Sequence, residues 1–230
     1  MNYLILGDGK LGTELHRQTG WDYISRKKDS IDFMDPETYR PFLEKNYDQI
    51  INCIGYTKTY EKERNPNWDL NYLGVMYLTN MCNNYNKKLI HISTDYVYAN
   101  STIGHSEDDI PVHFESWYSY TKLLGDAYVQ ALATNYLLIR TNFKPRPFPW
   151  KKAWDDIQGN FDYVDIIAKL IIDLIKAKAT GVYNVGTEPK TYYDLAKQTL
   201  SDCIKDNDGL HHPKDVTMNL NKLHNVKNSI

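Results

Sequence analysis

The first 141 residues alternate between short apolar segments and segments with helical periodicity. The apolar segments are residues 2–7, 22–25, 48–55, 87–93 and 135–141, and the helical segments are residues 10–19, 35–46, 65–86 and 117–133. Strands that are apolar along their whole length and separated by helices indicate a parallel sheet covered on both faces. We therefore predict an α/β fold: a Rossmann-like doubly wound parallel sheet with helices on both faces.

The character of the chain changes after residue 141. Residues 142–152 contain three prolines and predict a loop. Beyond it we predict a helix at 163–178, a strand at 181–186, a helix at 192–205 and an edge strand at 216–223, the rest of the polar tail being mobile. The predicted division is a dinucleotide-binding core at 1–141 and a small C-terminal substrate cap at 142–230, with strand 181–186 returning to the core sheet.

Composition excludes several classes of protein. The net charge of -2 gives no global field for nucleic acid or an anionic membrane. Three scattered cysteines indicate neither a disulfide framework nor a metal site, so we expect no metal and a reducing, cytoplasmic setting. No signal peptide or membrane span is expected, because the longest apolar stretch, 164–175, is interrupted by charges. His211 and His212 lie in the polar tail, where we expect both to be solvated.

A glycine-rich turn follows the first predicted strand. The sequence GDGKLG places Gly7, Gly9 and Gly12 at the spacing G-x-G-x-x-G, and the next helix opens within the motif. In this position the glycines permit a tight turn, a close backbone approach to a pyrophosphate and close packing of helix against strand. The phosphate would meet free N–H groups at the positive end of the helix. The turn therefore predicts a dinucleotide site.

The end of the second strand distinguishes the two nicotinamide cofactors. An acidic residue there binds the ribose 2′-hydroxyl of NAD, but this chain has Ser25, Arg26 and Lys27 instead. A guanidinium suits a 2′-phosphate, so NADP(H) is favoured and NAD(H) is the alternative.

A threonine, a tyrosine and a lysine are placed for proton transfer. Thr94 ends the fourth strand, and Tyr118 and Lys122 lie four apart on the following helix, so they share one face. A lysine cation near a phenol favours the phenolate and makes tyrosine a better proton carrier at neutral pH. Because open α/β sheets bind ligands at the carboxyl ends of their strands, we expect these groups to meet the glycine turn in one crevice.

The motifs GDGKLG, STDYVY (93–98) and YSYTK (118–122) resemble the extended short-chain dehydrogenase/reductase superfamily, and within it the dTDP-4-dehydrorhamnose reductases. INCIGYTKTYEKERNP (51–66), DLNYLGVMYLT, FDYVDIIAKLI and GVYNVG are similar to further landmarks of that family. The resemblance implies an NAD(P)H-dependent reductase of a nucleotide-linked 4-keto-6-deoxysugar. It implies hydride transfer from the nicotinamide with Tyr118 as proton donor.

The resemblance also implies a set of site residues. The catalytic residues would be Thr94, Tyr118 and Lys122. Cofactor contacts would come from Gly7, Gly9, Lys10, Leu11, Gly12, Ser25, Arg26, Asp32, Phe33, Cys53, Ile54, Gly55, Tyr56, Asn71, Tyr118 and Lys122. Substrate contacts are predicted at Thr57, Asp95, Tyr96, Lys144, Arg146 and Trp150, the last three through a basic, aromatic loop that could clamp a nucleotide diphosphate or be a plain surface loop.

The chain also departs from this family. Only about twenty residues separate the fifth strand from the helix near 163, where the family has a larger substrate lobe. A compact cap could take a smaller substrate or be completed by a second subunit, so a homodimer is left open. Two alternatives also stand: a sugar-nucleotide epimerase or dehydratase with bound NAD, and a non-catalytic NADP-binding regulatory subunit. Asp95-Tyr96 replaces the Asp-Glu pair of the dehydratases, which favours simple reduction.

Overall fold

The computed structural model describes residues 1–59, 61, 63–98, 104–109, 116–209 and 212–227. By compactness the chain divides into two units. The first comprises residues 1–93, 115–139 and 179–182, and the second comprises residues 94–114, 140–178 and 183–230. The predicted division after residue 141 concerns function rather than compactness, and it stays a prediction.

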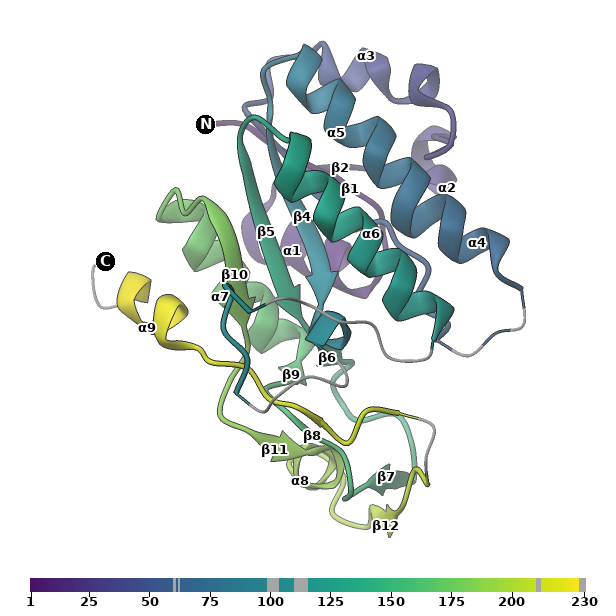
Figure 1. Cartoon of the computed structure of the whole chain (residues 1–230), viewed down its shortest axis with the longest axis vertical. Coiled ribbons are helices and arrows are strands. Elements are labelled where there is room, and N and C mark those ends of the chain that lie inside the picture. The colour runs from purple at the N-terminus through teal and green to yellow at the C-terminus, as the bar shows by residue number, and fades with distance from the viewer. Residues whose placement is uncertain (60, 62, 99–103, 110–115, 210–211, 228–230) are drawn as a thin grey trace. The chain divides into compact units, whose positions relative to one another are not determined.

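A six-stranded sheet with the order β10-β5-β4-β3-β1-β2 is the framework of the fold (Figure 1). Its strands are β1 (Tyr3–Leu6), β2 (Asp22–Ile24), β3 (Gln49–Asn52), β4 (Lys88–Thr94), β5 (Tyr136–Thr141) and β10 (Gly181–Val185). β1 pairs in parallel with both β2 and β3, and β3 pairs in parallel with β4. The strand order therefore reverses at β1, and the predicted doubly wound sheet is confirmed.

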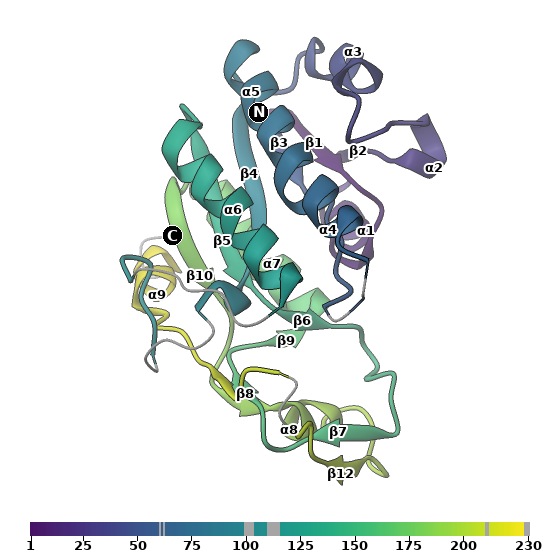
Figure 2. The same ribbon diagram turned by 45° about the vertical axis from the view of Figure 1, so that its right-hand side comes forward.

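Helices cover both faces of this sheet within the first unit. They are α1 (Lys10–Thr19), α2 (Arg26–Asp29), the 3₁₀ helix η1 (Pro36–Thr38), α3 (Arg40–Leu43), α4 (Asn65–Trp68), the π-helix η2 (Asp69–Leu73), α5 (Gly74–Asn84) and α6 (Trp117–Leu132). A Cβ placed on Gly12 of α1 would lie 3.4 Å from the Ile5 side chain, so α1 covers the Ile5 face. Leu4 and Leu6 point to the other face, where they share a core cluster with Leu78 of α5. Figure 2 shows α4 and α5 in one line on that face, with α6 beside them.

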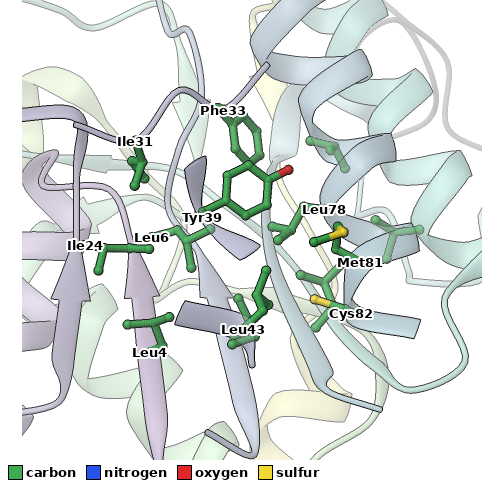
Figure 3. Close-up of a cluster of buried hydrophobic side chains, with 14 of the residues drawn as sticks. Leu4, Leu6, Ile24, Ile31, Phe33, Tyr39, Leu43, Leu78, Met81 and Cys82 are labelled. Carbon is green, nitrogen blue, oxygen red and sulfur yellow. The ribbon is translucent and has the colours of Figure 1, made fainter. Parts of the chain in front are cut away.

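The main core of the first unit lies between the sheet and helices α3 and α5. Figure 3 shows the Phe33 and Tyr39 rings together above Leu43, with Leu78 and Met81 across from them. The ring centroids of Phe33 and Tyr39 are 6.1 Å apart. Each buried side chain of this size contributes roughly 1.5–3 kcal/mol. This cluster therefore fixes β1 and β3 against α5, and so fixes the strand ends that follow.

Two predicted helices of the first unit are interrupted. The segment 35–46 forms η1 and then α3, because Pro41 lacks an N–H group and lies in the first turn of the second helix. The segment 65–86 forms α4, η2 and α5 in succession, so its middle is a π-helix. Helix α2 was not predicted at all; it is a single turn.

Within its described residues, the second unit is built from short strands, three α-helices and one 3₁₀ helix. Its elements are η3 (Asp95–Tyr98), β6 (Phe143–Lys144), β7 (Lys152–Trp154), β8 (Gln158–Gly159), β9 (Asp162–Tyr163), α7 (Val164–Lys176), β11 (Lys190–Thr191), α8 (Tyr192–Lys197), β12 (Ile204–Asp206), β13 (Asp215–Val216) and α9 (Asn221–Lys227). The strands pair as β11-β8-β13, β12-β7 and β6-β9. A second core cluster, which includes Phe161, Tyr163 and Tyr192, lies within this unit.

Several predictions for this region were wrong. The segment 142–152 is not wholly a loop, since it contains β6 and the start of β7. The helix predicted at 192–205 ends at Lys197, and β12 pairs with β7 instead. The edge strand predicted at 216–223 is present at Val216, which lies in β13 (Asp215–Val216), but residues 221–223 belong to α9. The rest of the tail, which was expected to be mobile, contributes Asp215 of β13 and the remainder of α9. Among the described residues, no helix is long and apolar enough to cross a bilayer.

The contact between Gly74 and Phe33 gives a test of the first core. A Cβ at Gly74 would lie 2.3 Å from the Phe33 ring, so Gly74→Ala forces this buried ring to move. Alanine favours a helix over glycine by about 1 kcal/mol, but overpacking costs roughly 1–3 kcal/mol. Because the overlap with the ring is severe, we take the upper part of that cost, about 2–3 kcal/mol, and expect a net destabilisation of about 1–2 kcal/mol in urea unfolding. Adding Phe33→Leu should recover part of the loss, and a single variant as stable as wild type would contradict the packing described.

Candidate active site

The glycine turn brings the start of α1 against the end of β1. Gly7 has a φ of 102°, which favours glycine, and its N–H donates to the Ile24 carbonyl at 2.9 Å. A Cβ on Gly12 would lie 2.0 Å from the Gly7 carbonyl oxygen, whereas a Cβ on Gly9 would meet nothing within 4 Å. Gly12 is thus required for packing, while Gly9 leaves open space beside the helix start.

The amino end of α1 is open to an anion. Gly9 is its N-cap, and no side chain caps the helix there among the described residues. The first N–H groups of an uncapped helix carry a partial positive charge and need acceptors. Lys10, Leu11 and Gly12 form this first turn, and their contact with a phosphate stays a prediction.

The turn after β3 lies beside the glycine turn. Asn52 accepts a hydrogen bond from the Ile54 N–H at 3.0 Å, and the Cys53 N–H donates to the Leu6 carbonyl at 2.9 Å. A Cβ on Gly7 would lie 3.0 Å from the Ile54 side chain. The predicted cofactor residues of these two turns are therefore brought together by the pairing of β1 with β3.

Asn71, predicted as a cofactor contact, holds the end of that turn. Its side-chain amide accepts from the Tyr56 N–H at 2.8 Å and donates to the Tyr56 carbonyl at 2.9 Å. A Cβ on Gly125 of α6 would lie 2.3 Å from the Asn71 carbonyl oxygen, so α6 and η2 are in backbone contact. Asn71 thus links the turn at 53–56 to α6.

The end of β2 is followed by three exposed cations, Arg26, Lys27 and Lys28. Ser25 is buried and caps α2 by accepting from the Lys28 N–H, while Asp29 accepts from the Ser25 N–H at 3.0 Å. Lys28 is held by the Tyr23 carbonyl and ring. Arg26 and Lys27 are exposed and, among the described residues, have no side-chain partner.

The two residues predicted near adenine differ in exposure. The Asp32 side chain is exposed and accepts from the Met34 N–H at 2.9 Å. The Phe33 side chain is part of the core, so only its backbone is available to a ligand.

The tyrosine and the lysine lie on α6 as predicted. Ser116 caps this helix by accepting from the Ser119 N–H, and Tyr118 is half-buried in the first turn. Lys122 is 5% exposed and donates to the Ile92 carbonyl at 2.8 Å. Burial lowers the pKa of Lys122 to about 8, against the opposing attraction of Asp126 and Cys53.

Thr94 and Asp95 form a buried pair in the second unit. The Thr94 hydroxyl donates to Asp95 at 3.1 Å, and the amide of Asn142 donates to the other carboxyl oxygen at 3.2 Å. Burial raises the pKa of Asp95 to about 7, although both hydrogen bonds and the nearby Lys144 charge act to lower it. Tyr96 is buried beside them, and its N–H donates to Thr94.

The basic loop is folded onto its own unit. Lys144 lies 4.3 Å from the centre of the Tyr192 ring. Arg146 donates to Asp165 at 3.0 Å and lies over the Tyr163 ring. Trp150 is 52% exposed, and its ring lies edge-on to the Phe148 ring. Unlike Lys144 and Arg146, it has no cation–ring contact or ion pair among the described residues. Thr57, on the turn after β3, is exposed.

Sequence reasoning missed two groups of buried polar side chains. In the second unit, His212 bonds Asp208, whose side chain is only 2% exposed, and its ring lies 4.6 Å from that of Trp154. The expectation that His212 is solvated was therefore wrong; His211 lies outside the described residues. In the first unit, Asp126 and Ser93 form a buried hydrogen bond near Lys122. The four-residue step from Lys122 to Asp126 was the available signal.

The chain was compared with known proteins. The family model described as RmlD substrate binding domain matches residues 1–143. The chain belongs to the RmlD substrate-binding-domain family. The resemblance to the dTDP-4-dehydrorhamnose reductases is thereby confirmed.

Individual members of this family and their structures are similar to the chain. The spore coat polysaccharide biosynthesis protein SpsK of Bacillus subtilis is 29% identical over 169 residues, which cover 70% of this chain and 56% of that protein. The dTDP-4-dehydrorhamnose reductase of Mycolicibacterium smegmatis is 30% identical over 130 residues, which cover 53% of this chain and 38% of that protein. The chain thus spans about half the length of the curated relatives it matches.

A solved structure confirms the fold. The dTDP-4-dehydrorhamnose reductase of Bacillus anthracis, solved in complex with NADP, superposes with a TM-score of 0.84 at 23% identity, over 97% of this chain and 92% of that one.

Within the described residues, no group of three or more His, Cys, Asp or Glu side chains is arranged to hold a metal ion.

The raised pKa of Asp95 predicts a pH-dependent stability. In the folded chain the carboxyl is protonated up to about pH 7, whereas in the unfolded chain it ionises near its ordinary value of 3.8. The folded state therefore binds the extra proton, and its stability falls as pH rises from about 4 to about 7, by up to about 4 kcal/mol.

Asp95→Asn removes this dependence. Urea unfolding of both proteins at several pH values should show the variant gaining stability relative to wild type as pH rises. Asp202→Asn, at an exposed position, is the matched control and should track wild type. If the difference between Asp95→Asn and wild type is the same at pH 4.5 and pH 8, the carboxyl is not held neutral by its surroundings.

Proposed function

We propose that this chain is an NADPH-dependent reductase of a nucleotide-linked 4-keto-6-deoxysugar. The observation that carries the proposal is the placement of Lys122: a buried ammonium held at the Ile92 carbonyl, one helical turn from Tyr118. The names of the relatives, which include dTDP-4-dehydrorhamnose reductases, support the substrate class. The NADP complex of the Bacillus anthracis protein supports the cofactor.

The cofactor would lie across the open ends of the strands. The first turn of α1 would bind the pyrophosphate, and Arg26 would meet a 2′-phosphate. Asp32, the Phe33 backbone and the turn at 53–56 would border the adenine and nicotinamide halves. When bound, the nicotinamide supplies the hydride that reduces the sugar ketone.

The residues of the chain would handle the proton and orient the substrate. Tyr118 would donate a proton to the ketone oxygen as it becomes an alcohol, and Lys122 would favour the phenolate left behind and bind the ribose hydroxyls. Thr94 would donate a hydrogen bond to the sugar oxygen once its hydroxyl turns away from Asp95, to which it donates in this structure. Tyr118 and Lys122 belong to the first unit and Thr94 to the second. That all three contact the same substrate molecule is therefore part of the proposal.

Substrate contacts are proposed for the second unit and for Thr57. Asp95 and Tyr96 adjoin Thr94 in sequence, and Lys144 adds a positive charge that acts on Asp95. Lys144 and Trp150 would hold the nucleotide half of the substrate, whereas Arg146 would have to leave Asp165 to join them. A cation and an exposed indole suit a diphosphate and a base.

Tyr118→Phe tests the proton donor. The change removes one hydroxyl from a half-buried side chain, so we expect an unchanged fold and cofactor affinity. Turnover of NADPH with a dTDP-linked 4-keto-6-deoxysugar should fall about 10²–10⁴-fold. The measurement is the decrease in NADPH absorbance under saturating substrate.

Other outcomes of this assay would select other functions. Turnover of Tyr118→Phe within a few-fold of wild type would remove the tyrosine from the mechanism. Firm NADPH binding by wild type without turnover of any sugar nucleotide would favour a regulatory subunit. Conversion of the sugar without net NADPH oxidation would favour an epimerase or a dehydratase.

Arg26→Asp tests the choice of cofactor. Wild type should bind NADPH more tightly than NADH, and the variant should reverse the order, with a change of at least about tenfold in the affinity ratio. Fluorescence titrations with both cofactors measure this ratio. Lys45→Asp, an exposed cation that precedes β3 and so lies toward the opposite edge of the sheet, is the control and should leave the ratio unchanged. Equal affinities in wild type would remove Arg26 from the site.

A further inference from the structure

A layer of buried polar side chains lies between the carboxyl ends of β3 and β4 and helix α6. Asn52, His91 and Ser93 lie on the strand face that also carries Leu89, and each is at most 4% exposed. Lys122 and Asp126 face them from α6 and are 5% and 0% exposed. Polar groups are costly to bury unless they are paired, so a layer of five at one place calls for an explanation.

Lys122 is the charged centre of this layer. Its ammonium donates to the Ile92 carbonyl at 2.8 Å, a contact that provides an acceptor but no negative charge. Burial alone would favour loss of its proton. Asp126 is the leading cause that opposes this effect, and the Cys53 thiol is a lesser one.

Both carboxyl oxygens of Asp126 are held in place. The Ser93 hydroxyl donates to one at 3.1 Å, and the Gln130 side-chain amide donates to the other at 2.5 Å. Because Asp126 follows Lys122 by four residues on α6, these bonds fix a carboxylate on the face of the helix that carries the ammonium.

His91 does not share the positive charge. The Asn52 side chain is oriented by its Oδ1, which accepts from the Ile54 N–H, so its Nδ2 donates to His91 Nδ1 at 3.2 Å. The proton of neutral His91 is then on Nε2, which is buried and has no partner among the described residues. Burial, together with the Lys122 charge, holds the pKa of His91 well below its ordinary value.

The other titratable groups near Lys122 are also neutral or lie on its own helix. Cys53 faces it from the turn after β3, and burial raises the pKa of this thiol to about 12. Tyr118 shares its helix face. In the described part of the chain, Asp126 is thus the carboxylate that acts on this ammonium.

We propose that Asp126, fixed by Ser93 and Gln130 one helical turn from Lys122, is a positioning residue that keeps the buried Lys122 ammonium protonated. It acts through Lys122 and has no contact of its own with substrate. The relevance to catalysis rests on the proposed function, but the effect on Lys122 exists in the unliganded protein and is measured there.

The experiment follows the Lys122 side chain by NMR in protein labelled with ¹³C,¹⁵N-lysine. Lys122→Arg assigns the signal by its disappearance. A pH titration gives the midpoint of Lys122 in wild type, Asp126→Asn and Asp126→Glu. We expect Asp126→Asn to lower the midpoint by about one pH unit or more, and Asp126→Glu to restore most of it.

Ser93→Ala separates the charge from its support. It leaves the carboxylate but removes one of its donors, so the midpoint should fall by less than in Asp126→Asn. Circular dichroism shows whether each variant folds, and Asp126→Ala replaces Asp126→Asn if the latter does not. A midpoint that is the same in wild type and in the folded uncharged variant would overturn the proposal.

Turnover provides the second measurement. The alkaline decline of kcat/KM should move to lower pH in Asp126→Asn and return in Asp126→Glu, a change that lost stability alone would not produce. If the NMR midpoint moves while no variant, wild type included, turns over a sugar nucleotide, then the positioning role stands and the proposed function fails.

Discussion

The close approach of α1 to the glycine turn is the constraint on which the first unit depends. A side chain at Gly12 would overlap the Gly7 carbonyl, so helix and strand can be this close only through backbone atoms. The approach aims the uncapped start of α1 at the carboxyl edge of the sheet. The turn after β3 then closes against Gly7, and Asn71 ties that turn to η2. Backbone contact, rather than side-chain chemistry, therefore shapes the proposed cofactor site.

Each unit contains a buried ionisable side chain, and burial shifts its pKa in a different direction in each. In the first, burial lowers the pKa of Lys122, but the Asp126 carboxylate opposes this effect. The resulting pKa of about 8 leaves Lys122 mostly charged at pH 7. In the second, burial outweighs the hydrogen bonds to Asp95 and raises the pKa of its carboxyl to about 7.

The parts of the fold that sequence predicts well are those set by local signals. Helix α1 (Lys10–Thr19) follows Gly9 and is ended by Gly20, which has the left-handed conformation, and both ends follow from the sequence. By contrast, β12 is a strand because it pairs with β7, some fifty residues earlier in the chain. The local sequence around β12 does not indicate this partner. Pro41 was an available signal for the break before α3, and the helical periodicity around it obscured this signal.

The site divides in the same way. Tyr118, Lys122 and the glycine turn are recognisable because their spacing is short and repeated in a known family. Ser93 and Asp126 are 33 residues apart, and only the stacking of α6 on β4 brings them together. The ion pair between Arg146 and Asp165 likewise depends on the folded arrangement, which the spacing of the two residues in the sequence does not predict.

The link through Asn71 has a consequence for motion. Its amide is bonded to both backbone groups of Tyr56, and its own carbonyl lies against Gly125. We therefore expect the turn at 53–56, η2 and α6 to open as one cooperative segment rather than as three. Amide hydrogen exchange at Tyr56 should then be as slow as exchange within α6, even though Tyr56 itself lies in a loop.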